Sequence, residues 1–114
     1  MLKIIHNPRC RKSRESLLLL REKNVTIEVI EYLKNPLLKR ELEEIISILK
    51  IEPEALIRKN EVIYKQYYKG KELSKKEAIE AMITYPILIQ RPIILKDGKG
   101  VIGRPPENVL NLFK

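Results

Sequence analysis

The chain has 114 residues, of which 44% are hydrophobic and 33% charged, and its formal net charge is +8, values typical of one ordinary globular domain. No apolar run reaches the roughly 18–20 residues of a membrane span, and the N-terminus shows no secretory signal. The lone cysteine, Cys10, excludes an internal disulfide and a four-cysteine metal site, so we expect a reduced, cytoplasmic setting.

The first third of the chain predicts a β-α-β unit. Leu2–His6 is a short apolar stretch typical of a buried strand, and Pro8 ends it. Leucines behind a polar first turn predict a helix over Lys12–Lys23, with Asn24 as its C′ residue. β-branched residues that alternate with glutamates predict a second strand over Val25–Tyr32. The cysteine therefore lies in the turn between the first strand and the helix.

The middle of the chain, residues 38–84, is predicted to be all-helical. Apolar residues over Leu38–Leu49 keep a spacing of three and four, which predicts an amphipathic helix. Pro53 suits the start of a short helix that runs to about Lys59, and Ser74 with Glu77 forms a capping box for another helix. Three tyrosines share a helical face and are expected to pack in the core rather than form a base-stacking platform: Tyr64, Tyr67 and Tyr68.

After this middle the pattern returns to strands. Pro92–Leu95 and Val101–Ile102 flank the turn sequence Asp97–Gly100, which predicts a β-hairpin, and Pro105 and Pro106 open a final helix. The order β-α-β, helices, β-β-α is, without its helical middle, that of an α/β thioredoxin-like fold with a mixed sheet. We expect a single domain, residues 1–114, with a core of residues 1–37 and 85–114 and a helical insertion of residues 38–84.

Cys10 is predicted to be a reactive thiol. At a helix N-terminus, the first-turn N–H groups and the helix dipole favour a thiolate. Four basic side chains surround it in the sequence and favour the thiolate further: Arg9, Arg11, Lys12 and Arg14. Such a site suits a sulfur nucleophile and a bound anion. The alternative, an inert buried cysteine, fits these neighbours poorly.

Two distant arginines are candidates for an anion site. Residues 1–37 and 85–114 carry net charges of +4 and +3, against +1 for residues 38–84, so the positive potential concentrates wherever the two ends fold together. Arg91 and Arg104 each precede a proline, which favours an extended backbone. The guanidinium fork donates paired hydrogen bonds to oxyanions. The alternative for either one is an ordinary surface arginine.

Two polar residues flank the cysteine. His6, the only histidine, leaves open a hydrogen bond that orients the loop or supports the thiolate, although a single histidine at a strand end is more often structural. Ser13 completes a Cys-x-x-Ser sequence, from which its side chain can donate to the thiolate or cap the helix. It cannot act as a resolving thiol.

These motifs resemble those of the glutaredoxin-linked arsenate reductase family (ArsC), which also contains the Spx regulators. The matching segments extend from the first strand to the final helix: Ile4–Cys10 with Ser13 and Arg14, Leu56–Asn60, Pro86–Ile94 and Gly103–Glu107. Arg9 and the Gly103–Pro106 run are most similar to the short arsenate-reductase-related branch of this family.

The resemblance implies a thioredoxin-like fold with a helical insertion, and it implies roles for the matching residues. Cys10 is the implied nucleophile, and three arginines are implied to hold the oxyanion: Arg58, Arg91 and Arg104. Arg58 rests on the resemblance alone, since by itself it is a helix-terminal cation. The residues implied to support the cysteine loop are His6, Ser13, Arg14 and Pro92, the last at the position of the family's cis-proline.

The resemblance also implies reduction of arsenate to arsenite. The arginines and the helix N-terminus offset the charge of the substrate, and Cys10 forms a thiol–arsenate adduct. Because the chain has no second thiol, glutathione and then glutaredoxin are the implied external electron donors, with no bound cofactor and no metal. We expect a monomer whose partners are a small oxyanion and glutaredoxin or glutathione, not a membrane or nucleic acid.

Two other functions stay open on the sequence. A Spx-like regulator binds RNA polymerase, but those relatives commonly carry Cys-x-x-Cys, and Ser13 removes the second thiol here. A monothiol disulfide-exchange protein, not specific for arsenate, needs only one nucleophilic cysteine.

Overall fold

A computed structural model describes residues 2–114, which form two compact units. The first, called the sheet unit below, consists of the chain up to Asn35 together with Arg91–Lys114. The second, called the helical unit, is Pro36–Gln90. These boundaries lie a few residues from the predicted limits of the insertion, residues 38 and 84. The interpretation of the whole chain as one domain stays a prediction.

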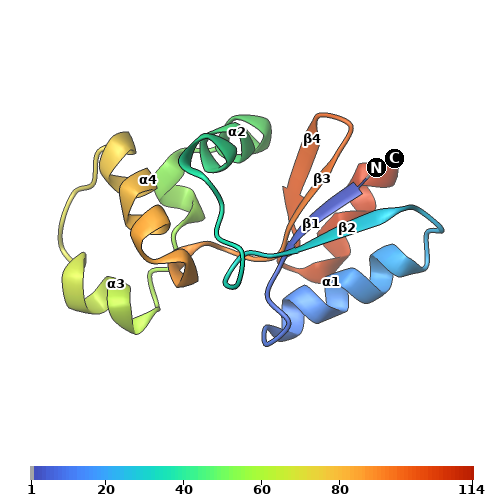
Figure 1. Cartoon of the computed structure of the whole chain (residues 1–114), viewed down its shortest axis with the longest axis horizontal. Helices are drawn as coiled ribbons and strands as arrows, with labels where there is room; N and C mark the ends of the chain where they lie inside the picture. The colour runs from blue at the N-terminus through green and yellow to red at the C-terminus, as the bar shows by residue number, and fades with distance from the viewer. Residues whose placement is uncertain (1) are drawn as a thin grey trace. The chain divides into compact units, whose positions relative to one another are not determined.

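The sheet unit contains a four-stranded mixed sheet in the order β2-β1-β3-β4 (Figure 1). Its strands are β1 (Leu2–His6), β2 (Ile27–Glu31), β3 (Ile93–Lys96) and β4 (Lys99–Ile102). β1 pairs in parallel with β2 and antiparallel with β3, which pairs antiparallel with β4. α1 (Arg11–Arg21) connects β1 to β2, and the 3₁₀ helix η3 (Pro106–Phe113) follows β4. The prediction of an α/β thioredoxin-like fold is confirmed.

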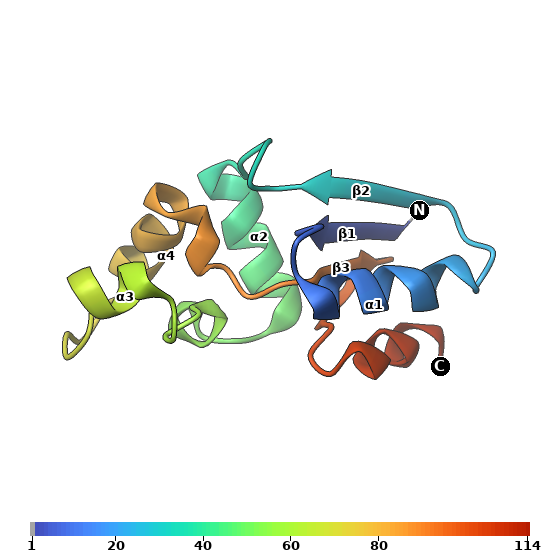
Figure 2. The same ribbon diagram turned by 90° about the horizontal axis from the view of Figure 1, so that it is seen from below.

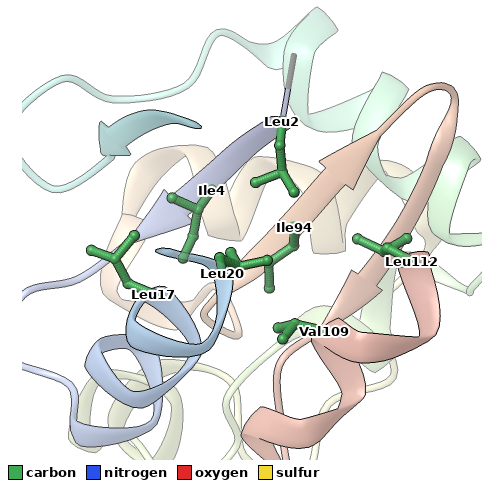
Figure 3. Packing of buried hydrophobic residues seen from close by; sticks show 7 residues of the cluster. All are labelled: Leu2, Ile4, Leu17, Leu20, Ile94, Val109 and Leu112. Carbon is green, nitrogen blue, oxygen red and sulfur yellow. The ribbon is translucent and has the colours of Figure 1, made fainter. Parts of the chain in front are cut away.

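The core of the sheet unit lies on one face of the sheet. Both α1 and η3 cover this face (Figure 2), and alternate strand residues point toward them, because successive side chains of a strand face opposite sides. Figure 3 shows the seven buried members of this core: Leu2, Ile4, Leu17, Leu20, Ile94, Val109 and Leu112. Fully burying a side chain of this kind contributes about 1.5–3 kcal/mol, so several of them hold α1, and with it the residue at its N-terminus, against the sheet.

The predicted elements of the sheet unit are present with shifted ends. β1 has the predicted bounds, whereas β2 is shorter than Val25–Tyr32. The hairpin turn is tighter than predicted, because Asp97 and Gly98 both have positive φ angles, 50° and 76°. This is the backbone that a two-residue hairpin turn requires, so the two residues after Gly98 belong to β4. The final helix is a 3₁₀ helix.

The helical unit is built from short helices. They are α2 (Lys39–Leu49), η1 (Pro53–Leu56), α3 (Val62–Tyr67), α4 (Lys75–Thr84) and η2 (Pro86–Leu88), with α4 packed against α2, η1 and η2. The predicted capping box is confirmed: Glu77 N–H donates to Ser74 Oγ at 3.1 Å, and Ser74 N–H donates to Glu77 Oε1 at 2.9 Å.

Two details of the helical unit correct the predictions. The helix that begins at Pro53 ends at Leu56 rather than near Lys59, because Ile57 is extended and forms an isolated β-bridge with Ile89. The tyrosines do not all pack in the core. Tyr64 is buried, but Tyr67 is 48% exposed. The Tyr64 ring stacks on Tyr68, and the Tyr67 ring stacks on Tyr85.

Candidate active site

Cys10 is the N-cap residue of α1. Its backbone is extended, with φ −92° and ψ 121°, and its carbonyl accepts the first helical hydrogen bond from Arg14 N–H at 3.0 Å. A tight turn precedes it, in which Cys10 N–H donates to the Asn7 carbonyl at 2.9 Å. Arg9 N–H donates to Asn7 Oδ1 at 3.0 Å in the same turn. The thiol is therefore held at the helix N-terminus, partly exposed and not in a disulfide.

The surroundings of the thiol favour its ionised form. Burial raises the pKa of the Cys10 thiol, but the Ser13 backbone N–H and the Arg91 and Arg104 side chains donate hydrogen bonds to the sulfur. These donors outweigh burial and leave the pKa of Cys10 below its ordinary value. Arg104 Nη1 lies 3.8 Å from Cys10 Sγ and also donates to the Arg91 carbonyl at 3.1 Å. A lowered thiol pKa is the property that a sulfur nucleophile needs.

The cations that contact the thiol are not its sequence neighbours, which corrects the prediction. The basic side chains expected to surround the sulfur are all exposed: Arg9, Arg11, Lys12 and Arg14. Arg11 pairs with Glu15 at 3.0 Å, and Arg14 Nη1 donates to the Pro8 carbonyl at 3.1 Å. Arg14 thus contacts the turn that presents Cys10 rather than the sulfur.

His6 and Ser13 fix the shape of this turn. His6 Nδ1 forms a 2.6 Å hydrogen bond with Ser13 Oγ, which also accepts from Asn7 N–H at 3.1 Å. The serine group that reaches the thiol is the backbone N–H, so the predicted donation from its hydroxyl is wrong. Burial lowers the pKa of His6, which is only 5% exposed. Of the two predicted roles for His6, the structure favours the orientation of the loop.

Arg91 and Arg104 both lie in the C-terminal segment of the sheet unit, Arg91–Lys114. Arg91 is only 6% exposed, so it is not an ordinary surface arginine, and Arg104 is partly buried. The Arg91–Pro92 peptide bond is cis, in agreement with the cis-proline that the resemblance implies, and the Arg104–Pro105 bond is cis as well. Two guanidinium groups and a helix N-terminus at one thiol form a site suited to an oxyanion.

Two residues that support Arg104, Gly103 and Asn108, were not predicted to do so from the sequence. A Cβ on Gly103 would lie 2.5 Å from Ser16 Oγ and 2.7 Å from Pro92 Cγ, so glycine allows β4 to end against α1. Asn108 Nδ2 donates to the Arg104 carbonyl at 3.2 Å and to the Ile102 carbonyl at 3.3 Å. Gly103 lies in a segment that carries the family resemblance, and a glycine directly before a candidate arginine is the one feature that could have indicated this support.

Arg58 belongs to the helical unit. Its Nε donates to Glu61 Oε2 at 3.0 Å, and both side chains are largely buried, at 14% and 23% exposure. Its backbone N–H donates to the Leu88 carbonyl at 2.7 Å, next to the bridge between Ile57 and Ile89. The role of Arg58 as a third oxyanion ligand stays a prediction.

A metal-ion cluster and a membrane-spanning helix are both absent from the described chain. Within residues 2–114, no three His, Cys, Asp or Glu side chains are grouped so that they could hold a metal ion. Over the same residues, no helix combines the length and the apolar character that crossing a membrane requires.

The chain is similar to known proteins along almost its whole length. The chain is 43% identical to the uncharacterized protein YfgD of Escherichia coli, over 97% of this chain and 95% of that protein. It is 37% identical to an arsenate reductase of Neisseria meningitidis, over 95% and 94% of the two chains. The solved structure of an arsenate reductase from Vibrio cholerae superimposes with a TM-score of 0.92 at 39% identity, covering 96% of this chain and 95% of that one. The model of the ArsC family matches residues 5–112, and this chain therefore belongs to the ArsC family.

Proposed function

We propose that this chain is an arsenate reductase-like oxidoreductase in which Cys10 is the nucleophile and Arg58, Arg91 and Arg104 hold the oxyanion. The observation that carries the proposal is the thiol itself, which lies at the N-terminus of α1 with two guanidinium groups donating to its sulfur. Relatives named arsenate reductase, from Neisseria meningitidis and Vibrio cholerae, support the choice of oxyanion.

In the first proposed step, the Cys10 thiolate attacks the arsenic of dihydrogen arsenate. A sulfur–arsenic bond forms, an arsenic–oxygen bond breaks, and the oxygen leaves as water with uptake of one proton. The thiolate and the substrate are both anions, so they repel each other unless cations lie between them. Arg91 and Arg104 supply those cations beside the sulfur, where preorganised charge stabilises the transition state without reorganisation.

In the second proposed step, an external thiol completes the reduction. The thiolate of glutathione attacks Cys10 Sγ, a disulfide bond forms, and the electron pair of the sulfur–arsenic bond stays on arsenic. Arsenic(V) thereby becomes arsenic(III) and leaves as arsenite. A glutaredoxin thiol then attacks the glutathione sulfur and releases the Cys10 thiol. The scheme needs no bound cofactor or second subunit, and it requires a compartment that keeps thiols reduced, hence the proposed cytoplasmic location.

The test is arsenate-dependent oxidation of NADPH in the presence of glutathione, glutaredoxin and glutathione reductase. We expect turnover with the wild-type chain and none above background with Cys10→Ser. Omitting arsenate from the wild-type reaction controls for reduction of other acceptors. Equal rates for the wild type and Cys10→Ser would falsify the proposal.

A second candidate is a monothiol disulfide-exchange protein that does not act on arsenate. The lowered pKa of the single cysteine favours it equally, because exchange needs only a nucleophilic thiolate. Arg91→Ala separates the two candidates. Loss of this oxyanion ligand lowers arsenate turnover steeply in the first, whereas disulfide exchange in the second needs no oxyanion ligand and changes only through the raised pKa of Cys10.

A further inference from the structure

A cavity of about 210 Å³ lies beside the loop that presents Cys10. Its walls are the loop residues 6–9 and three residues from the end of β2 and the segment after it: Glu31, Leu33 and Lys34. Among the residues that the structure describes, none that donates to the Cys10 sulfur lines it. Pockets for drug-sized ligands are about 300–1,000 Å³, so this cavity suits a group about the size of one amino acid.

The charges around the cavity include both signs. Arg9 and Lys34 are exposed cations, and Glu31 supplies a carboxylate. Lys34 Nζ lies 3.5 Å from Glu31 Oε1, with the two side chains 77% and 37% exposed. An exposed ion pair of this kind contributes little to stability, so both partners are available to a ligand.

His6 also lines the cavity. Its Nδ1 is bonded to Ser13 Oγ, and that oxygen also accepts from Asn7 N–H. Because a hydroxyl oxygen has one proton and two lone pairs, Ser13 can donate to Nδ1 or accept from it. In either case this bond fixes the position of the imidazole ring.

These groups complement a zwitterionic amino-acid end. The Arg9 guanidinium and the Lys34 ammonium group match a carboxylate, and the Glu31 carboxylate matches an ammonium group. Leu33, which is 41% exposed, offers apolar surface to a short aliphatic chain. A simple inorganic anion is a poorer match, since Glu31 repels it.

We propose that this cavity binds the zwitterionic amino-acid end of the small peptide thiol that reduces Cys10, an inference that rests on the proposed function. Arg9 is adjacent to Cys10 in the sequence, and consecutive Cα atoms are about 3.8 Å apart. Arg9 also lines the cavity, so a peptide thiol whose cysteine follows its zwitterionic end places that cysteine on the side of the loop that presents Cys10.

The test uses disulfides and no arsenate, so its result does not depend on the oxyanion that the site takes. The Cys10 thiolate attacks glutathione disulfide, a mixed disulfide forms and one glutathione thiolate leaves. Mass spectrometry gives the rate constant of this reaction and of the same reaction with bis(2-hydroxyethyl) disulfide, which carries no charge. We expect the double substitution Arg9→Gln and Lys34→Gln to slow the glutathione reaction about tenfold, the effect of one lost charge-assisted hydrogen bond. The reaction with the uncharged disulfide keeps its rate.

The matched control is Arg11→Gln. Arg11 is as close to Cys10 in the sequence as Arg9 and is equally a surface cation, but it pairs with Glu15 and does not line the cavity. Its replacement removes one of the charges that attract an anionic disulfide at long range but no group that lines the cavity, so we expect the ratio of the two rates to fall much less than in the double variant. A double variant with the wild-type ratio, or an equal fall in that ratio for Arg11→Gln, overturns the proposal.

Binding of the unreactive analogue S-methylglutathione gives a second readout. We expect its titration to shift the NMR amide signals of Asn7, Arg9 and Lys34 in the wild-type chain. The double variant keeps its fold, as judged by the other amide signals, and loses these shifts. Shifts confined to residues 91–104 contradict the proposal, because they place the peptide thiol on the arginine side of Cys10.

Discussion

Residues 9–14 and residues 91–104 are both rich in basic side chains, yet they use them differently. In the first region the cations are exposed, and Arg11 and Arg14 are bonded to Glu15 and to the Pro8 carbonyl. In the second, Arg91 is buried and Arg104 partly buried, and both donate to the Cys10 sulfur. Two charges 4 Å apart interact by about 1 kcal/mol in water and by about 4 kcal/mol near a protein surface. A partly buried cation that contacts the sulfur therefore stabilises the Cys10 thiolate more than an exposed cation that is only its neighbour in the sequence.

The largest expected difference between the two regions appears when one arginine from each is replaced. We expect Arg91→Gln to lower kcat/KM for arsenate about 100-fold, the usual cost of removing a preorganised donor, and to raise the pKa of Cys10. Arg11→Gln, the matched change in the exposed region, is expected to alter kcat/KM by less than about twofold. The coupled NADPH assay measures both, with thermal unfolding as a check on the fold. Equal losses in the two variants contradict the distinction between the regions.

Gly103→Ala tests the close contact by which residues 91–104 pack against α1, the helix that carries Cys10 at its N-terminus. The new Cβ meets Ser16 Oγ and Pro92 Cγ at distances shorter than ordinary contacts, and overpacking of this kind costs typically about 1–3 kcal/mol. We expect urea unfolding to show a loss of stability in this range. Adding Ser16→Ala removes the closest of these contacts and is expected to restore part of it. The prediction is contradicted if Gly103→Ala is as stable as the wild type. It is also contradicted if the loss of unfolding free energy in the double variant is as large as the sum of the losses in the two single variants.

The smallest expected effect concerns pH. Because the pKa of Cys10 is lowered in the folded chain, the folded state binds fewer protons than the unfolded state between the two pKa values. The stability that the thiolate contributes is thus fully present above the ordinary thiol pKa, about 8.5, and is lost as pH falls through the lowered folded value. The free energy of unfolding of the wild type, relative to Cys10→Ser, should rise with pH over this window.

The rate of alkylation by iodoacetamide reports the same titration directly. Its midpoint should lie below that of an unperturbed thiol, move to higher pH in Arg91→Gln and stay unchanged in Arg11→Gln. A midpoint that moves equally in both variants would mean that exposed and buried cations act alike on the sulfur.

Much of the local structure could be predicted from the sequence, because it depends on neighbours in the chain. The bounds of β1, the Ser74 capping box and the placement of Cys10 at a helix N-terminus are of this kind. The hairpin turn was also predicted at the right place, but as the four residues Asp97–Gly100; the positive φ angles of Asp97 and Gly98 make it a two-residue turn.

Arg91 and Arg104 were candidates because each precedes a proline, but their contact with the thiol could not be predicted from local pattern. Arg91 and Arg104 reach Cys10 through the pairing of β1 with β3 and of β3 with β4, which no spacing rule specifies. The support from Gly103 and Asn108 depends on contacts with Ser16 and with backbone carbonyls in the fold. Likewise, the exposure of Tyr67 follows from which face α3 presents, not from the helical spacing of the tyrosines.

The bonded hydroxyl of Ser13 has a consequence for how this chain can evolve. Cys-x-x-Ser is one substitution away from a two-cysteine motif that would close its own disulfide. Yet Ser13 is fully buried, and its oxygen joins His6 Nδ1 to the Asn7 backbone. Sulfur is larger and a weak hydrogen-bond partner, so Ser13→Cys would loosen the turn that presents Cys10 while adding the second thiol. A two-thiol variant of this chain therefore needs a second change, at His6, whose ring loses its hydrogen-bond partner when Ser13 is replaced.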